Sequence, residues 1–359
     1  MTNKSLELYK IFFHEIFQKN NLFEFNKVFG HFQLAYPEAL NQSDFKEAVL
    51  KEWHLYITEQ LFLLPLLEVE FHELIFHSET EISLQHFKEK RFFTQHLLTR
   101  EDYMLSLEIL ALKNGQKWNY LNPFVSFGHQ MNMKDFRITL LHPCLDPFSK
   151  PKLFIRKAHH SLLKLNQFNL NSPSIYKIQE LLDEKANILI AGATGSGKTS
   201  FLKTLLSECP AEEHVIILED THEISPQHFT HTNLLSDVKN ADKSLKAYLS
   251  YAMRMSPDRL IIGEMRSHEV IPYVLAMNTG HRGLMSTIHA NSAQDALTRL
   301  TLLFSLYQEN NSVTFETVLK LVTQSLDYVV YMENKTIKEI IKVQGSQGSS
   351  IIYQNVLMN

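Results

Sequence analysis

The residues whose types and spacing most clearly predict chemistry form a glycine-rich loop that ends in a lysine and a hydroxyl side chain. Residues 192–200 read Gly-Ala-Thr-Gly-Ser-Gly-Lys-Thr-Ser and match G-x-x-x-x-G-K-S/T without a mismatch. In this pattern the glycines let backbone N–H groups close around phosphates, the lysine reaches the β- and γ-phosphates, and the next hydroxyl binds Mg²⁺. We therefore predict a site for ATP and Mg²⁺ formed by Gly192, Ala193, Thr194, Gly195, Ser196, Gly197, Lys198, Thr199 and Ser200.

The elements around this loop favour a phosphate site over an ordinary glycine-rich turn. Residues 187–191 form an apolar run that predicts a strand, and residues 199–207 predict a helix with one apolar face. Strand, loop and helix in this order are what the motif requires, because the helix N-terminus adds its positive dipole end to the backbone amides.

Acidic residues stand at the ends of two buried apolar runs. Residues 215–218 are followed by Glu219 and Asp220, and residues 260–263 are followed by Glu264. In an open parallel sheet the carboxyl ends of the strands share one edge, so we expect these acids beside the phosphate loop. For either acid alone, a carboxylate that simply meets solvent is an equally reasonable interpretation.

The acids suit two roles in ATP hydrolysis. One carboxylate can hold Mg²⁺ through water, and another can orient or deprotonate the attacking water. We assign Glu219 and Asp220, with Thr199, to the metal, and favour Glu264 as the base because the small Gly263 lets neighbouring groups approach closely. The reverse assignment of Glu219 and Glu264 stays open.

Another apolar run, residues 283–288, ends in His289. A lone histidine is usually structural, but this one leaves its strand toward the same predicted edge, where it could sense the γ-phosphate. We keep both interpretations.

The wider pattern predicts an α/β protein with a smaller domain in front. From residue 176 to 359, buried runs alternate with helices, which is typical of a mainly parallel sheet. Residues 68–160 carry short extended runs and one helix that begins at a Thr99–Asp102 capping box, and they predict an α+β domain. Residues 161–175 are polar and contain proline, so we take them as a linker.

The first part of the chain, residues 1–67, predicts a helical region without recognisable chemistry. A helical spacing runs from Leu8 to Ile16 until Asn20 and Asn21 interrupt it. Ser43 is the expected N-cap of a second helix that continues to about Leu64.

Composition limits the function classes. The 359 residues carry a net charge of −4, which does not favour binding to nucleic acid or anionic lipid, and two isolated cysteines fit a reducing, cytoplasmic setting. The longest apolar stretch, residues 61–67, contains Pro65 and is too short for a membrane span. We also find no apolar core of the signal-peptide type at the N-terminus.

Four blocks in order resemble the secretion-ATPase superfamily that powers type II and type IV secretion and type IV pili. Residues 192–200 are similar to its Walker A motif and residues 217–223 to its acidic Asp box. Residues 259–266 resemble its Walker B motif, with Glu264 in place of the more common aspartate, and residues 280–292 resemble its His box.

Within that superfamily the chain is most similar to the CpaF-type ATPases of tight-adherence (Tad) pili. Residues 254–259, 276–281 and 153–157 carry this likeness. Two cysteines cannot supply the four-cysteine zinc insertion common in type II secretion ATPases, and Thr221 stands where retraction motors usually have proline.

The resemblance implies a RecA-like ATPase domain, a homo-hexameric ring, and ATP held between the two domains of each subunit. It also implies that Arg137 and Arg156 of the N-terminal domain reach the γ-phosphate, a role that suits the forked and permanently charged guanidinium. Taken alone, either arginine is more often a surface charge.

We therefore predict a cytoplasmic motor that hydrolyses ATP to power pilus assembly or secretion, attached to the inner membrane only through platform proteins. The alternative is the transport ATPase of a type IV secretion or conjugation system, which shares all four blocks. A RecA-like nucleic-acid motor is disfavoured because lysines and arginines do not cluster, so no direct binding of nucleic acid is expected. A regulator that binds ATP without cleaving it is disfavoured by intact Lys198, Glu219, Glu264 and His289.

Overall fold

The computed structural model describes residues 4–38, 47–86, 89–157, 162–225, 230–236, 240–308 and 313–357. The chain forms two compact units, Met1–Ala158 and His159–Asn359. Each unit has its own core, and each is described by itself below.

The first unit begins with helices packed through aromatic side chains. They are α1 (Lys4–Asn20), α2 (Phe25–Ala35) and α3 (Glu47–Thr58), and Ser43, the expected N-cap, lies outside the described residues. Helix α1 ends where the two asparagines predicted, and Asn21 takes a left-handed φ of 52°. Tyr9 and Phe13 are fully buried beside His54, whose imidazole bonds the Tyr9 hydroxyl at 2.9 Å. Burial lowers the pKa of His54 to about 4, so this histidine is a neutral core residue.

Helix α3 ends earlier than the sequence predicted. Gln60 adopts a left-handed φ of 52°, and its side-chain amide donates to the Ile57 and Thr58 carbonyl oxygens, both at 3.0 Å. These bonds satisfy the free carbonyls at a helix end and stop the helix at Thr58. The chain continues as η2 (Leu61–Leu63) and α4 (Leu64–Leu67).

The rest of the first unit is an antiparallel sheet with the order β3-β2-β1-β6-β5-β4, packed on one helix. Helix α5 spans Arg100–Lys113 and is capped by Thr99 Oγ1, which accepts from the Asp102 N–H as the capping box predicted. The strands are β1 (Glu73–Phe76), β2 (Glu81–His86), β3 (Glu89–Thr94), β4 (Phe124–Met131), β5 (Lys134–Leu141) and β6 (Lys152–Lys157), with η3 (Pro143–Leu145) between the last two. Strands β3 and β4 were not predicted; both lie at sheet edges, and most of β3 is exposed and lacks hydrophobic alternation.

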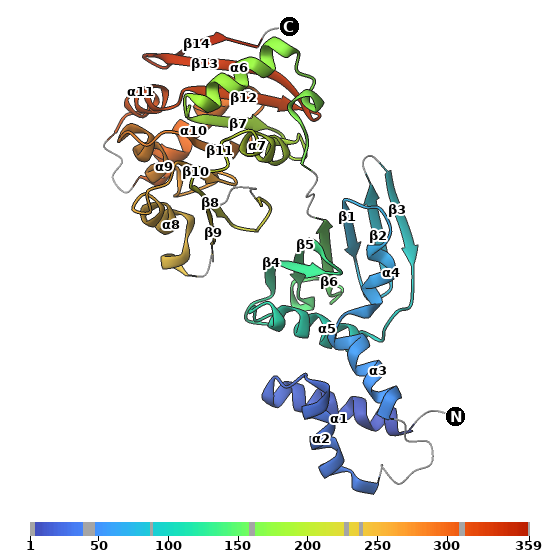
Figure 1. The fold of residues 1–359 in the computed structure, drawn as a ribbon. Helices are drawn as coiled ribbons and strands as arrows, with labels where there is room; N and C mark the ends of the chain where they lie inside the picture. The colour runs from blue at the N-terminus through green and yellow to red at the C-terminus, as the bar shows by residue number, and fades with distance from the viewer. Residues whose placement is uncertain are drawn as a thin grey trace. The chain divides into compact units, whose positions relative to one another are not determined.

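The second unit is built on an eight-stranded sheet with the order β14-β13-β12-β7-β11-β10-β8-β9 (Figure 1). The strands from β12 to β9 in this order are parallel, and β12, β13 and β14 are antiparallel. Their bounds are β7 (Ile188–Gly192), β8 (Val215–Glu219), β9 (His231–Leu235), β10 (Arg259–Ile262), β11 (Leu284–Ile288), β12 (Tyr328–Glu333), β13 (Thr336–Gln347) and β14 (Ser350–Asn355).

Helices cover both faces of this sheet, and each face has its own core. One face packs on η4 (Leu165–Phe168), α6 (Ser172–Asp183) and α7 (Lys198–Ser207). The other packs on α8 (Leu245–Ala252), α9 (Val270–Asn278), α10 (Ala293–Tyr307) and α11 (Phe315–Ser325), with η5 (Ala241–Lys243) before α8. Every residue of β7, β8, β10 and β11 is buried, which is why their sequences are continuous apolar runs rather than alternating ones.

The segment 161–175, predicted as a linker, is packed against the second unit over the residues that the structure describes, 162–175. Leu165 and Phe168 are buried in the core beneath α7, and the Asn171 side chain caps α6, whose first turn holds Pro173. Asparagine at the N-cap with proline in the first helical turn is a helix-start signal, and the polar composition of the segment led us to interpret it as a linker instead.

Across the part of the chain described here, no helix combines the length and hydropathy that crossing a bilayer requires.

Candidate functional site

The glycine-rich loop connects β7 to α7 at the carboxyl edge of the parallel strands. Gly195 and Gly197 take φ values of 75° and 98°, and α7 begins at Lys198 directly after them. Ser196 is buried, and its hydroxyl has no hydrogen-bond partner among the described residues. A buried hydroxyl without a partner, at a helix N-terminus whose first amides are open, fits a ligand with many acceptor oxygens.

Lys198 reaches back across the loop. Its ammonium donates to the Gly192 and Ala193 carbonyl oxygens, both at 2.9 Å, and the residue is 7% exposed. Burial lowers the pKa of Lys198 to about 8, because the charged form loses hydration that two carbonyls only partly replace. A triphosphate would supply the countercharge that this ammonium lacks.

His289 links the lysine to the next strand end. It follows β11, and its Nδ1 lies 3.3 Å from the Lys198 ammonium while its Nε2 lies 2.9 Å from Glu264 Oε1. The contact between Nε2 and Glu264 Oε1 is as short as a hydrogen bond but lacks the alignment of one. Burial and the nearby Lys198 charge lower the pKa of His289, so the imidazole is neutral at pH 7.

Glu264 follows β10 and Gly263, and it is held from two sides. The Thr287 hydroxyl donates to the Gly263 carbonyl at 2.7 Å, which ties the turn to β11, and the Arg266 guanidinium donates to the second carboxylate oxygen. Burial raises the pKa of Glu264, but Arg266, His289 and Lys198 together outweigh it and hold the pKa below its usual value. The carboxylate is therefore ionised at neutral pH.

Glu219 ends the neighbouring strand β8 at the same edge, but its surroundings differ. It is 4% exposed, and its carboxylate accepts the backbone N–H groups of Glu223 and Ile224 at 3.1 Å. Burial raises the pKa of Glu219, opposed by hydrogen bonds from His222, Ile224 and Glu223. The side chain also fits against Gly263, where a Cβ would lie 3.2 Å from Glu219 Cγ, so the small residue admits this neighbour.

The other two predicted metal ligands, Asp220 and Thr199, are less buried than Glu219. Asp220 is exposed and accepts a hydrogen bond from the Ser236 hydroxyl, while Thr199 is half-buried in the first turn of α7. Among the described ranges, no three His, Cys, Asp or Glu side chains gather as a metal cage. Mg²⁺ needs none, because it keeps several waters and is held by one or two protein oxygens and the substrate phosphates. Thr199 and Asp220 fit that donor set.

Arg137 and Arg156 belong to the first unit, where they are direct cross-strand partners on β5 and β6. Arg137 is half-buried and its Nε donates to the Ser126 hydroxyl at 3.3 Å, whereas Arg156 is exposed. The two guanidinium groups thus share one face of the sheet and form a paired cationic surface.

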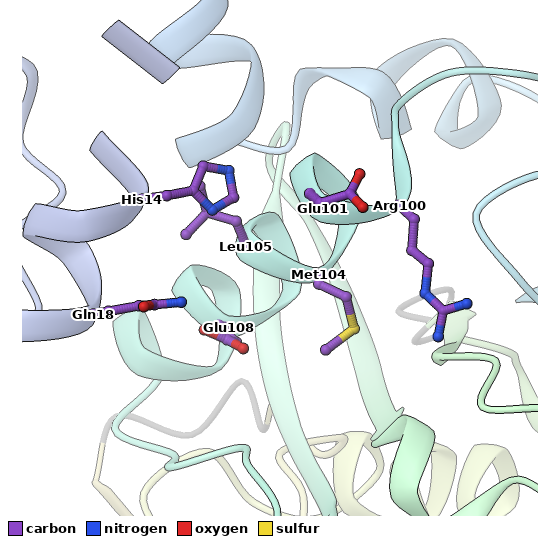
Figure 2. A pocket seen from close by; sticks show the side chains of 7 residues that line it. All are labelled: His14, Gln18, Arg100, Glu101, Met104, Leu105 and Glu108. Carbon is purple, nitrogen blue, oxygen red and sulfur yellow. The ribbon is translucent and has the colours of Figure 1, made fainter. Parts of the chain in front are cut away.

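The first unit also contains a cavity of about 230 Å³ between α1 and α5. Figure 2 shows His14 and Gln18 from α1 facing Glu101, Met104 and Glu108 from α5. None of the residues predicted for the ATP site lines it, so this cavity is separate from the phosphate loop.

Sequence reasoning missed two groups that hold the site: Thr287 on the Gly263 carbonyl, and the backbone of Lys335, which donates to the Ser196 carbonyl at 2.9 Å. The sequence left Arg266, inside the Walker B-like block, as a weaker candidate that a surface salt bridge would explain equally well, and the structure pairs it with Glu264. Nothing local in the sequence places residue 335 beside residue 196.

Comparison with known proteins agrees with this architecture. A family model described as type II/IV secretion system protein matches residues 127–353. The protein PtlH of the type IV secretion system of Bordetella pertussis is 36% identical over 153 residues, which cover 41% of this chain and 45% of PtlH. The conjugal transfer protein TrbB of Rhizobium radiobacter is 30% identical over 209 residues, covering 55% of this chain and 62% of TrbB.

The chain thus spans about half the length of the curated relatives that it matches. Among solved structures, the pilus retraction motor PilT with bound ADP superimposes with a TM-score of 0.59 at 20% identity, over 83% of this chain and 82% of PilT. This likeness shows a shared fold and confirms the predicted class, a RecA-like α/β fold preceded by a smaller α+β region.

Proposed function

The chain belongs to the type II/IV secretion system protein family, and from this premise we propose that it is an ATP hydrolase that powers a type IV secretion or conjugal transfer machine. The observation that carries the proposal is the contiguous row of Lys198, His289 and Glu264 at the strand edge beside the phosphate loop. PtlH and TrbB, whose names refer to type IV secretion and conjugal transfer, support the choice of machine.

Each residue in the row has a separate task. Lys198 and the loop amides bind the β- and γ-phosphates. Glu264, ionised at neutral pH, accepts a proton from water as the water oxygen attacks the γ-phosphorus, and the bond between that phosphorus and the bridging oxygen of ADP breaks. His289 contacts both groups, so it is suited to couple the γ-phosphate position to Glu264.

Mg²⁺ fits the hydroxyl of Thr199 and the exposed Asp220, and it would neutralise the charge that develops on the phosphates. Glu219 can reach such an ion directly only by giving up the amides of Glu223 and Ile224. We therefore assign Glu219 chiefly to fixing the loop after β8, which presents Asp220, with contact to the metal through water.

The remaining assignments rest on family membership. We propose a homo-hexamer at the cytoplasmic side of the inner membrane, attached through the membrane proteins of its machine. Arg137 and Arg156 are candidates to contact the γ-phosphate, and their side-by-side position suits one phosphate group. The CpaF-type pilus motor is a second candidate, supported by the sequence blocks at 254–259 and 276–281.

The proposal is tested with Lys198→Ala. The ammonium is the main positive charge in the loop, so we expect ATP hydrolysis to fall by at least about a hundredfold and nucleotide binding to be lost with the fold intact. Phosphate release measures hydrolysis, titration with a fluorescent ADP analogue measures nucleotide binding, and circular dichroism shows whether the variant is folded. Unchanged hydrolysis in a folded variant would refute the phosphate site.

A further inference from the structure

The turn between β12 and β13 forms a wall of the phosphate loop. Strand β12 is the parallel neighbour of β7, with Met332 opposite Gly192. Beyond it, Asn334 and Lys335 form the hairpin turn with left-handed φ values of 50° and 61°. The Lys335 backbone N–H donates to the Ser196 carbonyl at 2.9 Å, so a segment more than a hundred residues away is bonded to the centre of the loop.

Two of the loop glycines leave room for this hairpin. A Cβ on Gly192 would lie 2.4 Å from the Met332 carbonyl oxygen, and a Cβ on Gly197 would lie 3.4 Å from Lys335 Cα. Gly195, by contrast, has nothing within 4 Å of its Cβ direction, and only its φ of 75° requires glycine. The glycine spacing therefore serves the approach of a second backbone as well as the approach of phosphates.

The hairpin is anchored firmly enough to define a position. Met332 and Ile337, on either side of the turn, are 0% and 4% exposed and pack in the core that contains α7. The turn therefore cannot shift relative to the loop without disturbing that core.

We propose that the Lys335 backbone N–H is a positioning group for nucleotide binding, which orients the Ser196–Gly197 peptide so that the Gly197 N–H faces the phosphates. The peptide is trans, so its carbonyl and its N–H point in opposite directions. Holding the Ser196 carbonyl toward the hairpin directs the Gly197 N–H away from the hairpin. This inference rests on the proposed ATP site and assigns a function to a backbone group outside all four motif blocks.

The test replaces the Lys335 amide with an ester by incorporating the α-hydroxy analogue of lysine at that position, which removes the N–H and keeps the side chain. The matched control is the same replacement at Lys338, an exposed lysine of the same hairpin that has no partner in the β12–β13 register because of a bulge. Measurements are the dissociation constants of ATP and ADP, kcat at saturating ATP, and the thermal midpoint without nucleotide.

We expect the Lys335 ester to weaken ATP and ADP alike by about fivefold relative to the Lys338 ester, the size of one net backbone hydrogen bond. Because the Gly197 N–H would serve ground state and transition state equally, kcat at saturation should change by less than about twofold. The thermal midpoint of the Lys335 ester should lie about 2–4 °C below that of the Lys338 ester, because the first loses its bond to the Ser196 carbonyl.

Equal affinities for the two ester proteins would overturn the inference, as would a lower thermal midpoint for the Lys335 ester without a change in affinity, since the bond would then be structural only. If the unmodified protein does not bind ATP, the proposed function itself fails. The affinity of the unmodified protein therefore separates the two outcomes.

Discussion

Glu219 and Glu264 end neighbouring parallel strands at the same edge of the sheet, yet their surroundings are opposite. Glu219 is buried and its carboxylate is occupied by the backbone N–H groups of Glu223 and Ile224. Glu264 contacts the ionisable side chains of His289 and Arg266, and through His289 it is linked to Lys198. The carboxylate of Glu219 thus holds a loop, whereas that of Glu264 lies among ionisable side chains, which suits the reactive role that we propose for it.

The contrast shows that a strand-end position predicts where a carboxylate lies but not what it does. Burial raises the pKa of Glu219, whereas neighbouring cations hold the pKa of Glu264 below its usual value. A base must be ionised and able to reach water, and Glu264 meets these conditions better than Glu219.

Replacing Glu264 with glutamine should have the largest effect. The amide cannot accept the proton of water, so we expect hydrolysis to fall by about 10²–10⁴-fold. Affinity for ATP should be nearly unchanged, because the phosphates are held by the loop and Lys198. Single-turnover phosphate release measures hydrolysis, and equilibrium titration measures the affinity for ATP. The matched control is Glu219→Gln. If that variant stalls hydrolysis while Glu264→Gln does not, the two roles are reversed.

Removing the Glu219 side chain should chiefly affect stability. Glu219→Ala leaves the buried Ile224 N–H and its neighbour without an acceptor, which costs about 2 kcal/mol and lowers the thermal midpoint of this unit by about 4–8 °C. Glu264→Ala, whose Arg266 partner is exposed, should lower it by less than about 2 °C. Calorimetry on both variants is the measurement, and equal midpoints would contradict the distinction between anchor and reactive group.

Nucleotide affinity should fall as the pH rises from 7 to 9. The pKa of Lys198 is lowered to about 8 by burial, so the free protein loses this proton in that range, while bound phosphates would retain it. The dissociation constant for ATP should therefore rise by about tenfold. The control is Lys198→Arg, whose guanidinium does not titrate here, and the same pH dependence in that variant would exclude Lys198 as its origin.

The smallest effect is expected for Arg266→Ala. Arg266 lowers the pKa of Glu264, so its removal should move the acidic limb of the kcat profile to higher pH while the rate at neutral pH changes by less than about threefold. Arg254→Ala, which removes another exposed arginine, is the control. If the acidic limb of the kcat profile lies at the same pH in Arg266→Ala as in the unmodified protein, a group other than Glu264 sets that limb.

The sequence predicted the parts of the site that are encoded locally. The loop, its strand and helix, and the apolar runs that end in Glu219, Glu264 and His289 all follow from short patterns, and parallel strands bring their ends together. The hydrogen bonds that separate the roles of Glu219 and Glu264 could not be predicted, because they depend on how residues 220–224 turn back on the carboxylate.

The contact between the β12–β13 turn and the phosphate loop could not be predicted from the sequence for a different reason. Residues 328–332, before Asn334 and Lys335, form a continuous apolar run that indicates a buried strand but not its neighbours, and the pairing of β12 with β7 joins segments about 140 residues apart. The edge strand β3 was missed because most of its residues are exposed and lack hydrophobic alternation, whereas β4 was missed although its buried Val125, Phe127 and Met131 alternate with more exposed residues.

The most direct measurement is a crystal structure of the protein with Mg²⁺ and a non-hydrolysable ATP analogue. Our account predicts the triphosphate over residues 192–200 with the Lys198 ammonium on it, the Glu264 carboxylate facing the γ-phosphate, and Glu219 still bonded to the Ile224 N–H. A nucleotide bound elsewhere, or Glu219 released from its amides and facing the γ-phosphate in place of Glu264, would contradict it.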